Sequence, residues 1–480
     1  MPLPPERRAT LARAIADAIG ADKVIADDYS LRLYQYDAGV DTALPDLVLL
    51  PASSDDIATA MEKCLAEGVP VVPRGAGTGL AGGALAAEGG MVISFARLNR
   101  VLAIDPDNRR AVVQPGLINL HLSAATAADR LFFAPDPSSQ RASTIGGNIG
   151  NNAGGPHTLL YGVTVNHVTG VELITGAGER VRLGGAVADP VGYDLVGLVV
   201  GAEGTAGVVT EATVNLTPLP ESVKTMLVVF NSISDASAAV SAIIGAGIIP
   251  AALEMIDRII IQAVEDAYHA GYPRDAEAVL LVELEGLADG QDEDAAAIVE
   301  LCRGCGATDL KVAQTAHERE LLWLGRKAAA GAVGRITPEY YLMDGVIPRS
   351  RLPEVMEKIQ AIGARYNTVV ANVFHAGDGN LHPLVPFDGR VPGALKRAIE
   401  ATVEIMQVVI DVGGTLSGEH GIGLEKNNYM GLIFSEADLE VMQRVRRAFD
   451  PDLRMNPGKV FPNPGRCLEI ATPAAPGGII

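Results

Sequence analysis

The residues best suited to chemistry are three histidines and a glutamate in two glycine-framed stretches. The first stretch reads VFHAGDGNLHPL and contains His375 and His382, and the second reads LSGEHGIG and contains Glu419 and His420. A strand, a tight turn and a return strand would bring the first two rings to one side. Neutral imidazoles with one carboxylate are typical of a divalent-metal site that keeps open positions. Taken singly, each residue is better explained as a surface side chain, and only their grouping favours a site.

A base and a carboxylate clamp can also be assigned from residue type. A histidine that the metal does not use, most simply His420, could act as the base, because its free pKa lies near neutrality. Arg326 lies in WLGRKAAA, a predicted helix of small residues, and a planar guanidinium is the usual clamp for a carboxylate. The alternative, a solvated helix face, fits Lys327 better than Arg326.

Three glycine-rich stretches have the composition of a ligand cradle. They are PRGAGTGLAGG (73–83), APDPSSQRASTIGGNIGNNAGGPHTLLYG (134–162) and LVVGAEGTAGVVTEATVNL (198–216). Glycine loses the most backbone freedom on folding, so such stretches are costly as structure alone. Short side chains let backbone N–H groups approach a large polar ligand, and a phosphate-bearing cofactor is the natural candidate. The alternative is a set of flexible loops.

The first of these stretches contains G-x-G-x-x-G after a predicted strand, but it does not predict a Rossmann fold. Only residues 83–90 separate the loop from the next strand, whereas a parallel crossover with a helix needs roughly 10–12 residues or more. The acidic residue expected about 20 positions further on is also missing. We therefore expect phosphate binding by the backbone on a different scaffold, with Arg74 as the nearest charge.

Composition excludes several kinds of partner. The 480 residues carry 58 acidic and 38 basic side chains, a formal net charge of -20, which argues against nucleic acid and against an anionic membrane surface. The N-terminal stretch lacks the long apolar run of a secretory signal. Residues 236–253 are uncharged but rich in small residues, so we expect a buried helix followed by a strand rather than a membrane span.

Cysteine usage favours a reducing compartment. Four scattered cysteines are too few for a disulfide framework, which suits the cytoplasm: Cys64, Cys302, Cys305 and Cys467. The single C-x-x-C among them cannot supply the four thiolates of an iron–sulfur cluster, so we expect none on this chain.

Hydrophobic patterning predicts two regions separated by a linker at 217–222. The first has helices at 6–20, 53–67 and 118–129, strands at 46–50, 69–72, 91–95, 101–105 and 110–114, and a hairpin of 168–175 with 180–183. The second has strands at 226–230, 251–255, 279–285, 341–347 and 369–374 and helices at 234–244, 257–268, 292–302, 317–331, 353–366 and 393–412. Alternation around an open sheet indicates an α+β fold.

Several long motifs resemble the FAD-linked oxidase family with the vanillyl-alcohol-oxidase (PCMH-type) flavin fold. They are RGAGTGLAGGAL, APDPSSQ, GGNIGNNAGGPH, VGRITPEYYLMDGVIPR and NPGRC. The resemblance runs from about residue 47 to 461, and it is to the branch that oxidises D-2-hydroxy acids. That branch comprises glycolate oxidase D subunits, D-lactate dehydrogenases and D-2-hydroxyglutarate dehydrogenases.

The resemblance implies an α+β architecture in successive parts. These are an N-terminal helical segment (1–46), a PCMH-type FAD-binding domain of two α+β subdomains (47–222), a ferredoxin-like substrate or cap domain (223–410), a C-terminal helical segment returning to the flavin (411–461) and a Pro/Gly-rich tail (462–480).

The resemblance also implies which residues bind FAD. The pyrophosphate would lie on Pro73, Arg74, Gly75, Ala76, Gly77, Thr78, Gly79, Leu80, Gly82 and Gly83. The ribityl chain and isoalloxazine would be lined by Pro135, Asp136, Ser138, Ser139, Thr144, Gly147, Asn148, Asn151 and Gly154, and the cradle completed by Glu203, Gly204, Val209 and Asn456. Relatives that bind flavin covalently carry a histidine where this chain has Thr78 or its neighbours, so we expect non-covalent FAD.

For the chemistry, the resemblance implies that His375, His382 and Glu419 hold a divalent metal, zinc or manganese, which binds the substrate. His420 would take the hydroxyl proton while the Cα hydride goes to flavin N5. Arg326 would hold the substrate carboxylate and Asn380 would add a hydrogen bond.

The expected substrate is a short acid, glycolate or D-lactate. The 2-hydroxyglutarate branch carries a lysine where this chain reads Tyr341-Leu342-Met343, so a D-2-hydroxyglutarate dehydrogenase is the alternative. Electrons would pass to a partner, a quinone or a cytochrome. A flavoprotein-like subunit and an iron–sulfur subunit are the expected partners, and through them a cytoplasmic protein could associate with a membrane. Two hypotheses from other functional classes compete with this one: a metallo-hydrolase and a non-catalytic assembly subunit.

Overall fold

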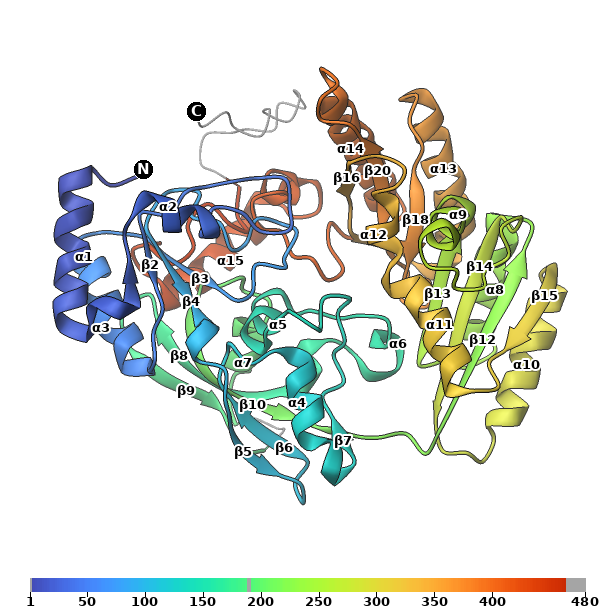
Figure 1. Cartoon of the computed structure of the whole chain (residues 1–480), viewed down its shortest axis with the longest axis horizontal. Helices are drawn as coiled ribbons and strands as arrows, with labels where there is room; N and C mark the ends of the chain where they lie inside the picture. Colours follow the sequence, from blue (N-terminus) through green and yellow to red (C-terminus); the bar gives the residue numbers. More distant parts are fainter. Residues whose placement is uncertain (1, 188–190, 463–480) are drawn as a thin grey trace. The chain divides into compact units, whose positions relative to one another are not determined.

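The computed structural model describes residues 2–187 and 191–462, and within them the chain forms two compact units (Figure 1). Unit 1 draws on residues up to 155, on 162–219 and on the chain from 419, whereas unit 2 comprises 156–161 and 220–418. The predicted tail, including Cys467 and the NPGRC motif, lies outside the described residues except for Pro462.

Unit 1 begins with a small sheet in the order β1-β2-β4-β3, whose members are β1 (Val24–Ile25), β2 (Leu47–Leu49), β3 (Val71–Arg74) and β4 (Met91–Ser94). β3 and β4 are parallel, yet the connection between them contains no helix. The expectation of a scaffold other than the Rossmann fold is thus confirmed. Helices α1 (Pro5–Ile19) and α3 (Ser54–Ala66) pack together beside this sheet, and Ser53 caps α3 as predicted (Figure 1).

A second, antiparallel sheet of unit 1 has the order β5-β6-β10-β8-β9. Its strands are β5 (Val101–Asp105), β6 (Arg110–Val113), β8 (Val168–Thr175), β9 (Arg180–Gly184) and β10 (Gly207–Asn215), and β7 (Leu131–Phe132) pairs separately with β11 (Thr217–Pro218). The helices of unit 1 also include α2 (Asp28–Leu31), α4 (Asn119–Thr126), α5 (Ile145–Asn151), α7 (Leu195–Val199) and α15 (Glu436–Phe449). Buried aliphatic side chains of β6, β8 and β10 form the core between sheet and helices.

Unit 2 is built on a seven-stranded antiparallel sheet in the order β15-β12-β14-β13-β18-β20-β16. The strands are β12 (Ser222–Phe230), β13 (Ala252–Asp257), β14 (Ala278–Gly286), β15 (Ala307–Val312), β16 (Glu339–Leu342), β18 (Ala371–Phe374) and β20 (Pro383–Phe387). The first four follow the 4-1-3-2 order of a β-α-β-β-α-β unit, with α8 (Ile233–Gly245) and α10 (Gln291–Gly304) as its crossovers. The α+β fold predicted from the sequence is therefore confirmed, and residues 236–253 are a helix and a strand as expected.

The remaining helices of unit 2 form two groups. α8 contacts α10 and α13 (Leu352–Arg365), which in turn contacts α14 (Ala394–Asp411). α9 (Arg258–Ala267) contacts α11 (Ala316–Lys327) and α12 (Ala329–Val333). α6 (Thr158–Tyr161), although it lies early in the sequence, belongs to this unit and contacts β13.

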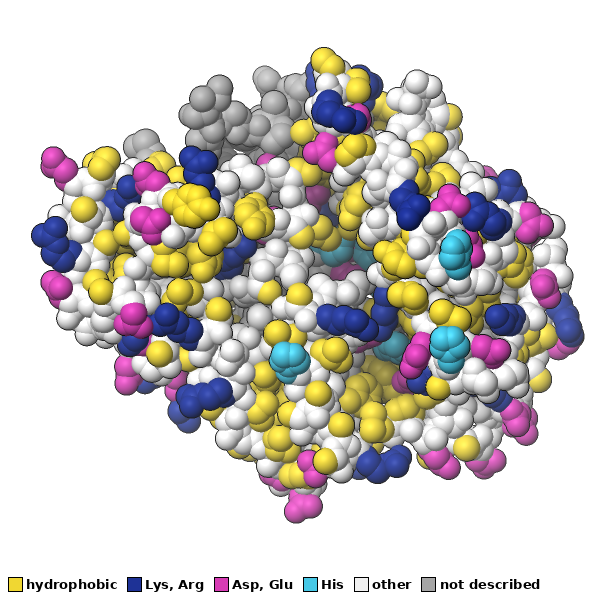
Figure 2. All heavy atoms as spheres, in the orientation of Figure 1, with side chains coloured by type: hydrophobic (Ala, Val, Ile, Leu, Met, Phe, Trp, Pro, Cys, Tyr) yellow, Lys and Arg dark blue, Asp and Glu magenta, His cyan; other side chains and the backbone are white. Residues whose placement is uncertain are grey.

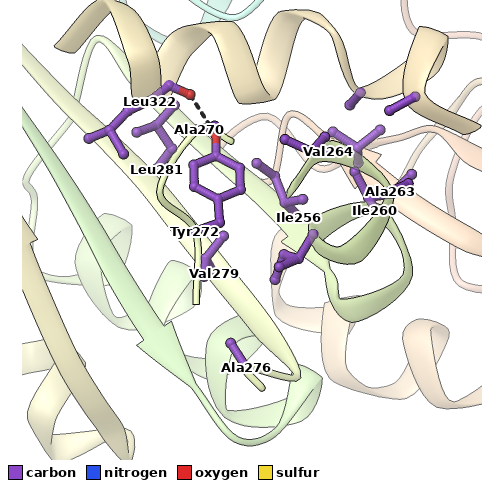
Figure 3. Packing of buried hydrophobic residues seen from close by; sticks show 14 of the residues in the cluster. Ile256, Ile260, Ala263, Val264, Ala270, Tyr272, Ala276, Val279, Leu281 and Leu322 are labelled. Carbon is purple, nitrogen blue, oxygen red and sulfur yellow. Dashed lines mark hydrogen bonds between the residues drawn. The ribbon is translucent and has the colours of Figure 1, made fainter. Parts of the chain in front are cut away.

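A buried hydrophobic cluster attaches α9 and α11 to one face of the unit 2 sheet. Figure 3 shows Tyr272 among Ile256, Val264 and Leu281, with its hydroxyl directed at α11. That hydroxyl donates to the Leu322 carbonyl at 2.5 Å. Side chains along β13 point alternately to the two faces of the sheet, so Ala252, Glu254 and Ile256 share one face. Ala252 and Ile256 belong to the cluster that α11 covers, so Glu254 lies on that face as well.

Three predicted elements differ from those in the structure. The strand expected at 341–347 divides into β16 and β17 (Gly345–Val346), with the buried Asp344 between them. The helix expected at 317–331 ends at Lys327 and restarts as α12. The glycine-rich stretch at 134–162, in which no helix was predicted, contains α5, because Thr144 caps its first turn.

No described helix is both long and apolar enough to cross a membrane. On the face shown in Figure 2, acidic and basic side chains are interspersed rather than gathered by sign. Large hydrophobic side chains are exposed along 29–44, where Tyr29 is 84% and Leu33 62% exposed.

Gly325 of α11 lies against the ring of Tyr272, and a Cβ at this position would be 2.7 Å from the ring. We therefore expect Gly325→Ala to destabilise unit 2 by about 1–3 kcal/mol, since overpacking forces neighbouring groups to move. Thermal unfolding measures the effect as a lower midpoint.

Gly245→Ala is the matched control, because Gly245 is also helical and its Cβ would meet nothing within 4 Å. That substitution should leave the midpoint unchanged or raise it. Equal midpoints for the two variants would show that the approach of α11 to Tyr272 is not close.

Candidate active site

The first glycine stretch follows β3 and is organised by Arg74. The Arg74 guanidinium donates through Nη2 to the Tyr36 carbonyl at 2.7 Å, and the side chain is 6% exposed. Gly77 has φ of +72°, and a Cβ there would lie 2.3 Å from Arg74 Nη2. A side chain at 77 would displace the guanidinium, so this glycine is required by close approach.

The second stretch turns around α5. The Thr144 hydroxyl accepts from the Gly147 amide at 3.2 Å, and a Cβ on Gly75 would lie 2.6 Å from that hydroxyl oxygen. The first and second glycine stretches therefore pack directly on each other within unit 1. In the same way, a Cβ on Gly155 would lie 2.4 Å from the backbone of Asp136.

Polar atoms around these loops fit a polar ligand such as FAD. Three buried side-chain atoms find no hydrogen-bond partner among the described residues: Arg74 Nη1, Ser143 Oγ and Asn148 Nδ2. Buried polar groups are nearly always hydrogen-bonded, so unmet ones beside glycine loops point to a missing polar partner. The side chains and the cradle of unit 1 therefore suit the cofactor that the motifs imply.

Glu203 and Asn456 support the loops through their own hydrogen bonds. Both oxygens of Glu203 accept backbone amides, from Ile422 at 2.6 Å and Gly423 at 2.7 Å. Burial raises the pKa of Glu203, and these two amides oppose the shift. Asn456 Nδ2 donates to the carbonyls of Gly83 at 2.8 Å and Glu203 at 2.6 Å.

The buried Lys459 completes this support. Its ammonium donates to the Leu85 carbonyl at 2.7 Å and to Asn456 Oδ1 at 3.1 Å. Burial lowers the pKa of Lys459 to about 8, although the nearby Glu203 carboxylate works in the opposite direction. The C-terminal segment of unit 1 thus fixes the ends of the first and third glycine stretches.

The predicted base, His420, lies on the segment that Glu203 holds. Asn151 Nδ2 donates to the His420 carbonyl at 3.2 Å. Glu203 binds the amides two and three residues further on. Two residues predicted to bind FAD therefore also fix the backbone at His420 and just after it, and direct contact of their side chains with FAD stays a prediction.

The two histidines of the first predicted stretch lie together in unit 2. His375 follows β18 and is 3% exposed, and His382 follows β19 (Asn380–Leu381) and is 7% exposed. Their ring centroids are 5.1 Å apart, and the rings meet edge to face. Gly379 has φ of +74°, and a Cβ there would lie 2.2 Å from the Ile347 carbonyl, so the turn between the strands needs glycine.

A fully buried carboxylate joins the predicted clamp to the first histidine. Glu254 Oε2 accepts from Arg326 Nε at 2.6 Å, and Glu254 Oε1 lies 2.8 Å from His375 Nδ1. Burial would raise the pKa of Glu254, but the charge of Arg326 and the hydrogen bonds from Arg326 and His375 outweigh it and hold the pKa below its usual range. Arg326 is buried as expected of a functional residue, and Lys327 is exposed, with its ammonium over the Trp323 ring.

Asp344 and Asn380 lie close to the second histidine. Asp344 Oδ1 is 3.6 Å from His382 Nε2, and Asp344 Oδ2 accepts from the Gly418 amide at 2.9 Å. Asn380 is 6% exposed and its Oδ1 finds no partner among the described residues. A Cβ on Gly418 would lie 2.6 Å from the Asn380 side chain, so glycine is needed beside it.

This donor set fits a divalent metal. Two imidazoles face each other, the ring of one is oriented by a carboxylate, and oxygen ligands are at hand, which is the chemistry that zinc and manganese accept. Buried ring nitrogens beside a guanidinium could also bind an anionic substrate directly.

Sequence reasoning missed Glu254 and Asp344. Both are acidic residues in otherwise apolar stretches, AALEMID and YYLMDGV, and both are 0% exposed. An acidic residue within a predicted core strand is a usable signal, since buried carboxylates are rare unless paired. The sequence did identify Glu203, Asn456 and Asn151, but it predicted that they contact FAD and not that they hold the backbone.

All of the predicted FAD residues lie in unit 1. Along the first stretch they are Pro73, Arg74, Gly75, Ala76, Gly77, Thr78, Gly79, Leu80, Gly82 and Gly83; along the second, Pro135, Asp136, Ser138, Ser139, Thr144, Gly147, Asn148, Asn151 and Gly154; and elsewhere Glu203, Gly204, Val209 and Asn456.

Comparison with known proteins decides the family. Residues 45–184 match the FAD binding domain, and residues 219–460 match the C-terminal domain of FAD linked oxidases. Glycolate oxidase subunit GlcD of Escherichia coli (strain K12) is 46% identical over 469 residues, covering 98% of this chain and 94% of the relative. The chain belongs to the FAD-linked oxidase family. It is an FAD-linked oxidoreductase, as the motifs predicted.

Two further comparisons extend this result. D-lactate dehydrogenase of Anaerostipes hadrus is 31% identical over 87% of this FAD-linked oxidase and 90% of its own length. The structure of p-cresol methylhydroxylase with substrate bound superposes with a TM-score of 0.78 at 16% identity, covering 96% of this chain and 98% of that one. The PCMH-type fold is therefore confirmed.

Replacing Glu203 by Gln removes one of the two oxygens that accept amides from residues 422 and 423. An unmade buried hydrogen bond costs about 1–3 kcal/mol, so amide exchange in this segment should become roughly tenfold faster or more. Hydrogen–deuterium exchange of peptides covering 420–424 measures the change.

Glu172→Gln serves as the control, because Glu172 is also buried in unit 1 but binds Arg182 and Thr210 instead. Exchange over 420–424 should be the same in that variant as in the wild type. Unchanged exchange in Glu203→Gln would mean that its carboxylate does not fix the segment.

Proposed function

We propose that this FAD-linked oxidase oxidises a short 2-hydroxy acid, glycolate or D-lactate, to the 2-oxo acid. The observation that carries the proposal is 46% identity to a glycolate oxidase subunit over 98% of the chain. A buried arginine and two facing imidazoles in unit 2 supply the chemistry that such a substrate needs. FAD, when bound, would supply the acceptor for the hydride that leaves the substrate's Cα.

In this proposal Arg326 binds the substrate carboxylate. Its Nε is committed to Glu254, so the carboxylate would be bound through the Nη groups. The guanidinium is oriented before the substrate arrives, which lowers the entropic cost of binding. A local positive group is needed, because a chain of net charge -20 repels an acid elsewhere. Asn380, whose buried Oδ1 has no partner among the described residues, would accept a hydrogen bond.

His375, His382 and Glu419 are the proposed metal ligands, and His420 is the proposed base. A divalent metal, when bound, lowers the pKa of the substrate hydroxyl. His420 would then take the hydroxyl proton on a ring nitrogen, while Asn151 and Glu203 keep its backbone in place. Glu419 directly follows Gly418, whose amide Asp344 holds. Zinc and manganese are the proposed ions.

A short acid is favoured over D-2-hydroxyglutarate. The lysine that marks the diacid branch is replaced by Leu342 or one of its neighbours, and Leu342 packs on the hydrophobic cluster of unit 2. The metallo-hydrolase alternative loses its support, since both matched domains belong to FAD-linked proteins.

The proposal includes partners and a compartment. The relative from Escherichia coli is named as a subunit, so we propose that this chain passes electrons to a flavoprotein-like and an iron–sulfur subunit. Cys64, Cys302 and Cys305 are free thiols, which suits a cytoplasmic protein that meets a membrane only through partners.

Anaerobic titration of the purified protein tests the reaction, with the visible flavin band as the signal. We expect glycolate and D-lactate to bleach the flavin, L-lactate and D-2-hydroxyglutarate to bleach it weakly, and a chelator to abolish the reaction. His420→Ala should slow bleaching by roughly 10²–10⁴-fold while FAD stays bound, because a general base contributes about that factor.

A flavin that no 2-hydroxy acid reduces would overturn the substrate assignment and leave the family intact. Bleaching that a chelator does not affect would remove the metal from the proposal.

A further inference from the structure

We infer that Glu254 is a positioning residue that sets both the metal-binding nitrogen of His375 and the orientation of Arg326. The inference rests on the proposed function, since it assumes that His375 binds a metal and Arg326 a substrate carboxylate. It adds a single carboxylate that fixes the spacing between the two.

The contacts of Glu254 leave neither oxygen uncommitted. Oε2 accepts from Arg326 Nε at 2.6 Å, and Oε1 lies 2.8 Å from His375 Nδ1. Glu254 is 0% exposed, Arg326 5% and His375 3%, so water does not compete for these groups. Charge-assisted hydrogen bonds in such surroundings are short and strongly directional.

These contacts determine the tautomer of His375. An ionised carboxylate only accepts hydrogen bonds, and the neighbouring guanidinium keeps Glu254 ionised. Nδ1 of His375 must therefore carry the proton that Glu254 Oε1 accepts. Arg326 Nη2 lies 3.5 Å from the same nitrogen, and a protonated Nδ1 cannot accept from it, so the shorter contact with Glu254 at 2.8 Å decides the tautomer. The lone pair of neutral His375 is consequently on Nε2, where a metal would bind.

The three residues come from elements that the sheet holds in register. Glu254 lies on β13, His375 directly follows β18, and these strands pair with Met255 opposite Phe374. Arg326 comes from α11, which Tyr272 and the hydrophobic cluster attach to the same face of the sheet. Glu254 thus contacts both the clamp and the ligand.

The shape of the substrate explains why the metal ligand and the carboxylate clamp should be fixed relative to each other. A 2-hydroxy acid carries its hydroxyl and carboxylate on adjacent carbons, so the metal and the carboxylate clamp must keep a fixed separation. Small displacements of positioned groups reduce rates strongly. With both groups bound to Glu254, neither can rotate without losing a buried charged hydrogen bond.

Asp257 offers a matched comparison on the same strand, β13. It is 4% exposed and also accepts from β18 and from a helix of unit 2, through the Asn372 amide at 2.7 Å and the Ile260 amide at 3.0 Å. Neither donor belongs to the proposed site. Glu254→Gln and Asp257→Asn therefore each replace a buried carboxylate of β13, and of the two only Glu254 contacts a proposed ligand.

The test measures metal binding rather than turnover. Purified, FAD-loaded wild type, Glu254→Gln and Asp257→Asn are titrated with zinc and with manganese against a chromophoric chelator, and FAD content is read from absorbance. We expect Glu254→Gln to bind metal about 10–100-fold more weakly, the usual effect of removing the partner of a ligating histidine. Asp257→Asn should match the wild type, and Glu254→Asp should recover part of the loss.

The outcomes separate this inference from the proposed function. A wild type that binds neither metal contradicts the proposed metal chemistry and with it the role of Glu254. A wild type that binds metal as tightly as Glu254→Gln overturns the role of Glu254 alone.

A second measurement applies even if Glu254→Gln does not fold. Nitrogen NMR of wild-type protein labelled in histidine, without metal, reports which ring nitrogen carries the proton. We expect His375, assigned through His375→Gln, to be protonated on Nδ1. Protonation on Nε2 alone would overturn the inference.

Discussion

A carboxylate that stays ionised in a protein interior must be surrounded by donors, and the candidate site of this chain depends on that constraint. Removing a charge from water costs several kcal/mol unless hydrogen bonds replace the lost hydration. Glu254 meets the requirement with Arg326 and His375 in unit 2. In unit 1, burial raises the pKa of Glu203, and two backbone amides that donate to its oxygens oppose that shift. In each unit, the groups that donate to the carboxylate belong to residues proposed to take part in catalysis, or lie close to such a residue in the sequence.

Glycine has a complementary role in unit 1. Arg74 and Thr144 pack closely against the backbone at positions 75 and 77. A Cβ at either position would lie within 2.6 Å of one of their polar atoms, so only glycine fits there. The same close approach leaves buried polar atoms of Arg74, Ser143 and Asn148 without partners among the described residues. Loops that look costly as structure therefore suit a polar cofactor such as FAD, whose atoms would supply the missing partners.

The sequence was sufficient for the fold class and the family, because both rest on long motifs and on regular hydrophobic patterns. The spacing of His375 and His382 also correctly predicted a turn that brings the rings together, since alternation along strands fixes which side chains share a face. The grouping of Glu254 with Arg326 was not predictable. It joins residues 72 positions apart, and only the pairing of strands and the packing of α11 bring them into contact.

Some predicted element boundaries were also wrong, because they too depend on tertiary contacts. Asp344 interrupts a strand, and a buried polar residue in an apolar run gives no local signal of a break. α5 forms in a glycine-rich stretch of poor helix propensity, because Thr144 caps it and Ile145 and Ile149 are buried in the core. Tertiary contacts outweigh local preference in both cases.

The imidazoles of unit 2 are proposed to form a metal site whose geometry is fixed before substrate binds. X-ray absorption at the metal edge of the zinc-loaded wild type tests it most directly. The account predicts two imidazole ligands with Zn–N distances of about 2.0–2.1 Å, together with oxygen, and the loss of one imidazole in His382→Ala. A spectrum with oxygen ligands alone, or one that His382→Ala leaves unchanged, would contradict it.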